Sequence, residues 1–153
     1  MSENEELMES RLEQILNDAL IKATDTYSVP PQIIWVDNST IATLGNFSAS
    51  TGKAKAKKTF NVSALVAASL SNGTVLNYRA CLPEGKRRIL YVDTEQSRYH
   101  CHNVLARILK LAGLPTDMDN KNLDFIGLRE YTPAIRMEVI DYALAHNYGY
   151  GLV

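Results

Sequence analysis

Residues 52–59 read G-K-A-K-A-K-K-T, and the interpretation of the whole chain depends on this stretch. A phosphate-binding P-loop consists of a glycine, four further residues and then Gly-Lys-Ser/Thr. Gly52 and the pair Lys58-Thr59 match that pattern, whereas Lys57 stands where the second glycine is expected. Glycine at that position permits positive φ angles that a side chain makes costly, by about 1 kcal/mol. The ammonium group of Lys57 would instead add attraction for a polyphosphate.

The segments on either side of this loop are of the kind that a P-loop requires. Residues 41–48 predict a weak strand leading into the loop, and residues 59–70 predict a buried helix because they are apolar nearly all round. Backbone N–H groups and the helix N-terminus would then surround a phosphate. The alternative interpretation is a solvated, lysine-rich loop. The residues expected to bind the phosphorylated ligand are Gly52, Lys53, Lys55, Lys57, Lys58, Thr59 and Phe60.

The rest of the chain alternates between predicted strands and predicted helices. Strands are expected at residues 33–36, 89–92 and 122–126, and helices at residues 5–23, 99–111 and 133–145. This alternation predicts an α/β domain built on a parallel sheet. A turn is expected at residues 37–39, a left-handed helix cap at Gly73 and an excursion loop over residues 77–88.

The 153 residues are enough to bury one core, so we expect a single folded domain. Residues 1–30 would form an amphipathic helix and a linker, and residues 31–153 the domain itself. Residues 151–153 read Gly-Leu-Val, which is how a further buried strand would begin. We therefore expect the domain to be incomplete at its C-terminus and the chain to be a fragment of a longer protein.

Composition excludes several broad classes of function. The net charge of -1 provides no overall attraction for nucleic acid or for an anionic membrane. The acidic N-terminus lacks the layout of a signal peptide, and no apolar run approaches the roughly 20 residues of a membrane span. Cys81 and Cys101 have no metal-ligand spacing and form no disulfide framework. We expect a cytoplasmic protein without a membrane partner.

A second chemically informative stretch is I-L-Y-V-D-T-E-Q-S, residues 89–97. An apolar strand that ends in acids places carboxylates at the carboxyl edge of a sheet, where α/β proteins bind ligands. In one interpretation, this is the Walker B strand and Asp93 is the acid that orients a magnesium ion. In another, it is the strand beside the Walker B strand, and Glu95 is the base that polarises an attacking water. In a third interpretation, Asp93 and Thr94 only cap the following helix.

The order of P-loop, apolar helix and strand-Asp-x-Glu resembles the RecA-like P-loop NTPase core, especially the branch of RepA-type hexameric helicases. Residues 52–60 and 90–97 carry this resemblance, which covers residues 33–153. The chain is also similar to RecA-like ATPases encoded on mobilizable transposons and related mobile elements of gut bacteria. The resemblance implies a parallel sheet flanked by helices.

The resemblance also implies ATP and Mg²⁺ as ligands, DNA as a partner and a ring of identical subunits. Lys58 and Thr59 match the phosphate and magnesium contacts of the family, and Glu95 matches its catalytic glutamate. Two departures are Lys57 in place of glycine and the lack of the later Walker B aspartate. We therefore expect the parent protein to be a helicase-type ATPase of a mobile element, and this chain to be inactive alone. The alternative function is a non-catalytic module that uses the lysine-rich loop to bind nucleotide or DNA phosphate.

Overall fold

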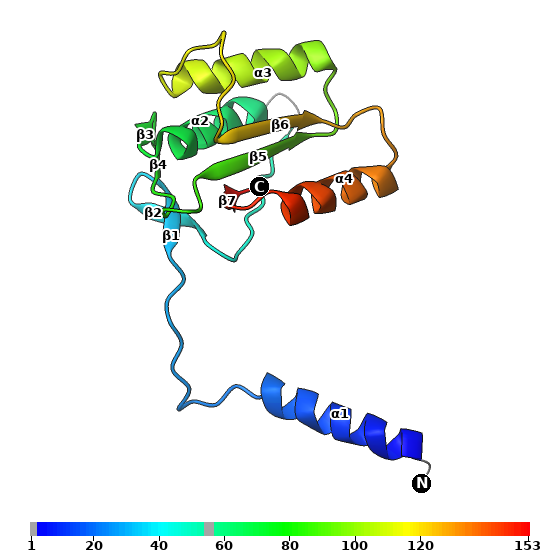
Figure 1. The fold of residues 1–153 in the computed structure, drawn as a ribbon. Helices are drawn as coiled ribbons and strands as arrows, with labels where there is room; N and C mark the ends of the chain where they lie inside the picture. Colours follow the sequence, from blue (N-terminus) through cyan, green and yellow to red (C-terminus); the bar gives the residue numbers. More distant parts are fainter. Residues whose placement is uncertain (1–2, 54–56) are drawn as a thin grey trace.

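The computed structural model describes residues 3–53 and 57–153, and it has an α/β architecture (Figure 1). The helices are α1 (Glu3–Ala19), α2 (Lys58–Ser71), α3 (Arg98–Leu111) and α4 (Pro133–His146). The strands are β1 (Gln32–Val36), β2 (Ser39–Thr43), β3 (Thr74–Val75), β4 (Tyr78–Ala80), β5 (Arg88–Asp93), β6 (Leu123–Gly127) and β7 (Tyr150–Leu152). Strands and helices therefore alternate from α2 to β7, apart from the short pair β3 and β4.

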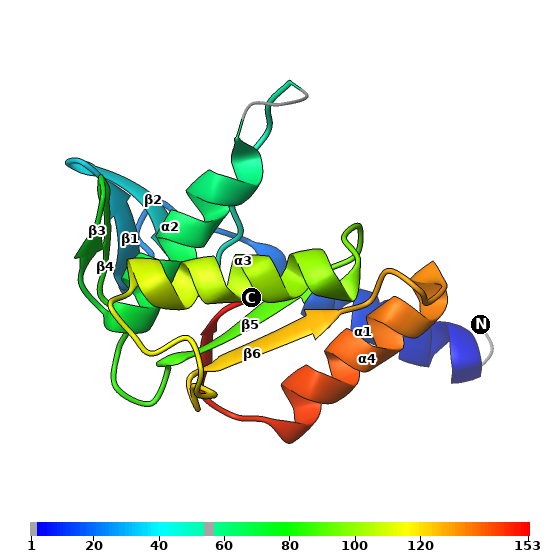
Figure 2. The same cartoon turned by 90° about the horizontal axis from the view of Figure 1, so that it is seen from above.

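The predicted parallel sheet is confirmed for three strands, in the order β6-β5-β7. The predicted strands at residues 89–92 and 122–126 are confirmed as β5 and β6. Because β6 and β7 lie on opposite sides of β5, right-handed crossovers require α3 and α4 to lie on opposite faces of the sheet. Figures 1 and 2 show this arrangement, with α2 on the same face as α3.

A second sheet is antiparallel, with the order β2-β1-β4-β3, and was not expected. The weak strand predicted at residues 41–48 is instead β2, which pairs with β1 and does not join the parallel sheet. The predicted turn is confirmed: Asp37 and Asn38 form a two-residue hairpin loop, and Asp37 has a φ of 50°. The expected loop over residues 77–88 contains β4, so that prediction was wrong. Strands of two or three residues are too short for an alternating pattern to appear.

Helix α2 packs against β3, β4, β5 and α3, and its central residues are the most deeply buried of any helix. Its C-terminus differs from prediction by one residue. Asn72, with a φ of 51°, takes the left-handed cap that we expected at Gly73, and the Gly73 N–H donates to the carbonyl of Ala68 at 3.1 Å. Asn72 also accepts the Leu82 N–H on its side-chain oxygen at 2.5 Å, which explains an asparagine there.

Helix α1 lies apart from the rest of the chain and is joined to it by a linker without regular structure (Figure 1). It ends at Ala19, four residues before the predicted end. All residues from Asn4 to Gln32 are exposed, including the apolar side chains that recur along α1. None of the helices in the described ranges is both long enough and apolar enough to cross a membrane.

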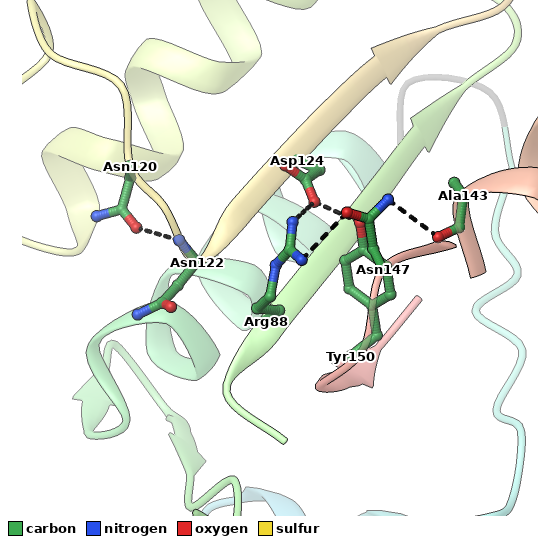
Figure 3. Close-up of polar contacts among 7 residues, drawn as sticks. All are labelled: Arg88, Asn120, Asn122, Asp124, Ala143, Asn147 and Tyr150. Atoms are coloured by element: carbon green, nitrogen blue, oxygen red, sulfur yellow. Dashed lines mark hydrogen bonds and ion pairs between the residues drawn. The ribbon is translucent and has the colours of Figure 1, made fainter. Parts of the chain in front are cut away.

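A polar network links the side chains of β7 to those of β5, its neighbour, and of β6 beyond it (Figure 3). The Arg88 guanidinium pairs with Asp124 at 2.6 Å and donates to the Asn147 side chain at 3.3 Å. The Tyr150 hydroxyl donates to the same Asp124 carboxylate, and Arg88 also lies 4.9 Å from the centre of the Tyr150 ring. Burial and this hydrogen bond both raise the pKa of Tyr150 above its ordinary value of 10.0. The network therefore connects all three parallel strands with the end of α4.

Replacing Tyr150 with phenylalanine tests this network. We expect Tyr150→Phe to lower the free energy of unfolding by about 1 kcal/mol near neutral pH, because one hydrogen bond to a carboxylate is lost. The neutral phenol is favoured in the folded state, so its contribution is complete below pH 10 and disappears as the pH rises through the raised pKa. Urea unfolding should therefore show a gap between wild type and variant that narrows at alkaline pH. A gap that stays constant would contradict this role.

Candidate functional site

Helix α2 begins directly after a residue with a left-handed backbone. Lys57 is the N-cap of α2 and adopts the left-handed conformation, with φ 56° and ψ 27°. Its carbonyl accepts the N–H groups of Phe60 at 3.0 Å and Asn61 at 3.1 Å, which starts the helix at once. Lys58 and Thr59 therefore occupy the first turn, and both side chains are exposed. The position where the pattern has glycine is thus a position where glycine is favoured.

The start of α2 carries no group that would compete with an anion. Its N-cap makes no side-chain hydrogen bond, and its first turn contains no acidic residue. The first N–H groups of a helix lack intrahelical partners and carry partial positive charge. Gly52 and Lys53, at the start of the loop, are exposed, and Phe60, which follows the loop in α2, is 40% exposed. Lys55, which we also expected to bind, lies outside the described residues.

Asp93 has a structural role in the loop after β5. Its Oδ1 accepts the backbone N–H groups of Glu95 at 2.9 Å and Gln96 at 2.7 Å, and its Oδ2 accepts the Gln96 side-chain amide at 2.8 Å. The side chain is 8% exposed. The interpretation that Asp93 caps the following helix was wrong: the N-cap of α3 is Ser97, and Asp93 instead stabilises the loop before it. Glu95 itself is exposed, in a loop whose shape Asp93 fixes.

Burial and the negative charge of Asp93 act on two neighbouring groups. Burial raises the pKa of the Tyr91 hydroxyl and of the Cys101 thiol, and the Asp93 carboxylate raises both further. The Tyr91 ring stacks on Phe125 with a centroid distance of 4.4 Å, so it belongs to the core. A thiol with a raised pKa is a poor nucleophile, and Cys101 is therefore a packing residue.

The structure does not bring the two predicted parts of the site together. In Figure 2 the N-terminal end of α2 lies apart from the edge at which β5 and β6 end. Lys58 and Thr59 begin α2, whereas Asp93 ends β5 and Glu95 lies in the loop after it. Neither Lys58 nor Thr59 lines the cleft at that edge. Over residues 3–53 and 57–153, no group of three or more His, Cys, Asp or Glu side chains gathers where it could hold a metal ion.

Sequence reasoning missed a cleft at the carboxyl edge of the parallel sheet. It has a volume of about 280 Å³ and is lined by the loop after β5 and the loop after β6. None of the predicted site residues lines this cleft, whose cations are Arg98 and Arg129. The available signal was the position of the lining residues in the segments that follow two core strands, at the edge where parallel sheets bind ligands.

Comparisons with known protein families, with characterised proteins and with solved structures found no match to this chain.

The left-handed backbone of Lys57 leads to a direct prediction. Lys57→Gly should raise the free energy of unfolding by about 0.5 to 1 kcal/mol, because glycine adopts a positive φ without steric cost. Lys57→Ala serves as the control, since it removes the same ammonium group but keeps the Cβ atom. Urea unfolding of both variants distinguishes backbone strain from charge. Equal stability of the glycine and alanine variants would show that Lys57 is not strained.

Proposed function

We propose that this chain is the nucleotide-binding part of a RecA-like P-loop ATPase that acts on the DNA of a mobile element. The observation that carries the proposal is the conformation of Lys57. It adopts the backbone that the glycine of the pattern supplies, directly before a helix that begins with Lys58 and Thr59. A lysine-rich loop that only kept the protein solvated would not require this backbone.

Each residue at the start of α2 has a role in this proposal. The Lys58 ammonium would neutralise the outer phosphates of ATP, and the N–H groups of the first turn would donate to phosphate oxygens. The Thr59 hydroxyl would hold Mg²⁺, which keeps most of its water ligands and needs few from the protein. When bound, the ion would neutralise charge on the phosphates. Lys57 would add a second positive charge beside Lys58.

Hydrolysis needs, in addition, a group that polarises the attacking water beside the bound phosphates. Glu95 would polarise the attacking water, which requires it to reach the phosphates held at α2. The two places are separate here, so we expect binding without turnover. Asp93 would act as a positioning residue for Glu95, since its carboxylate already accepts three hydrogen bonds in its own loop.

Assembly and the DNA partner belong to the same proposal and rest on the resemblance of the sequence. In a ring of identical subunits, a neighbour would supply an arginine that stabilises the transition state. The second candidate function is a module without catalysis, in which the exposed Lys53, Lys57 and Lys58 bind DNA phosphate. Such a module would show DNA affinity that falls steeply with salt and does not depend on ATP.

The proposal predicts that ATP binding depends on Lys58. Isothermal titration of the chain with ATP and Mg²⁺ should show binding, and Lys58→Ala should weaken it about tenfold or more, because a charge-assisted hydrogen bond is lost. Lys121→Ala is the matched control: it removes the same charge from an exposed side chain outside α2.

Two results would contradict nucleotide binding at this loop. One is the absence of ATP binding in wild type, which would favour the DNA-phosphate module. The other is equal affinity in wild type and Lys58→Ala, which would place the nucleotide elsewhere on the chain.

A further inference from the structure

The cleft at the carboxyl edge of the parallel sheet is not used by the proposed nucleotide site. It lies between the loops that follow β5 and β6. One loop leads to α3 on one face of the sheet, and the other leads to α4 on the opposite face (Figures 1 and 2). In open α/β sheets, ligands bind where successive connections diverge in this way, because the loops leave a crevice between them.

Both walls of the cleft are fixed by hydrogen bonds that converge on Asp93. Its carboxylate accepts the N–H groups of Glu95 and Gln96, which shapes the first wall. Its backbone carbonyl accepts the Leu128 N–H at 2.7 Å, which anchors the second wall. The Arg136 guanidinium donates to the Leu128 carbonyl at 3.0 Å and holds the same wall from α4. The cleft is therefore formed before any ligand arrives.

The lining of the cleft is suited to an anion. Arg98 comes from the first residue of α3, and Arg129 comes from the loop after β6. Within the described ranges, neither guanidinium has an ion-pair or hydrogen-bond partner, although Glu130 lines the same cleft. Arginine recognises phosphate through paired N–H donors, so two uncommitted guanidinium groups favour a phosphate ligand. Ser97 adds a hydroxyl that makes no capping bond.

An apolar pocket continues from this cleft. It has a volume of about 450 Å³ and is lined by α3, β6 and the loop after β6, with one residue from α4. It shares Arg98, Gly127 and Tyr131 with the cleft. The Tyr131 side chain is 45% exposed at the junction, where a flat ring would stack on it. Apolar side chains of the pocket come from Leu105, Phe125, Ile126, Leu128 and Val139. The combined site therefore fits a ligand with a phosphate at one end and a flat, largely apolar body at the other.

We infer that this cleft binds a nucleoside phosphate, with the phosphate on Arg98 and Arg129 and the base beside Tyr131. The same chemical unit occurs in a free mononucleotide and in single-stranded nucleic acid. The site does not involve Lys58, so binding here is separable from ATP binding at α2. The single-stranded outcome rests on the proposed function, because DNA is the partner named there.

The test uses the full chain carrying Lys58→Ala, which lacks the lysine proposed to bind ATP. Isothermal titration is carried out with AMP in one arm and with oligothymidylate in the other. We expect binding in at least one arm, weakened about tenfold or more by Arg98→Ala and by Arg129→Ala. Arg11→Ala removes the same charge from α1 and should change nothing. Binding of AMP assigns the free nucleotide, whereas binding of the oligonucleotide alone assigns the single strand.

Two results would overturn the inference: no binding of either probe, or unchanged affinity in both arginine variants. Thermal unfolding checks that the variants fold, which we expect because both guanidinium groups lack partners. Arg98→Lys and Arg129→Lys provide a second pair of variants. They keep the charge but lose the paired donors, so we expect each to bind the probe more weakly than wild type and more tightly than the matching alanine variant.

Discussion

The close packing of α2 against both sheets is the contact on which the rest of the structure depends. Its buried residues are nearly all small, which lets the helix backbone approach its neighbours: Ser63, Ala64, Val66, Ala67, Ala68 and Ser69. The Ser63 hydroxyl donates to the carbonyl of Thr59 at 2.7 Å, so a polar side chain is buried without losing its hydrogen bond. Burial stops at Ser63, and the first turn of α2 is left exposed. The fold therefore buries the middle of the helix and leaves its first turn exposed to solvent.

Long apolar runs and caps were predictable from the sequence, whereas short pairings were not. The run at residues 89–92 defines the central strand, and Thr132, next to Pro133, caps α4 by accepting the Ile135 N–H at 3.4 Å. The antiparallel sheet was missed because β3 and β4 have two and three residues. The pairing of β2 with β1 depends on a hairpin turn whose partner strand the local sequence does not specify.

The candidate sites, too, were predictable from the sequence only in part. Residue types and order identified the loop before α2, but only the backbone angle of Lys57 shows that its junction with the helix suits a glycine position. The convergence of two loops on Asp93 is a tertiary property, because Leu128 is distant from it in sequence. The cleft beside Arg98 and Arg129 was therefore invisible to motif reasoning, although each arginine lies directly after a core strand or at the start of a helix.

The central claim is that the start of α2 holds the phosphates of a nucleotide. The most direct measurement is an NMR titration of the isotope-labelled chain with ATP and Mg²⁺, in which the backbone amide chemical shift of each residue is recorded. The account predicts the largest shifts at Lys57, Lys58, Thr59 and Phe60, where backbone N–H groups would donate to the phosphates. Shifts confined to the cleft from Gln96 to Tyr131, or no shifts at all, would contradict it.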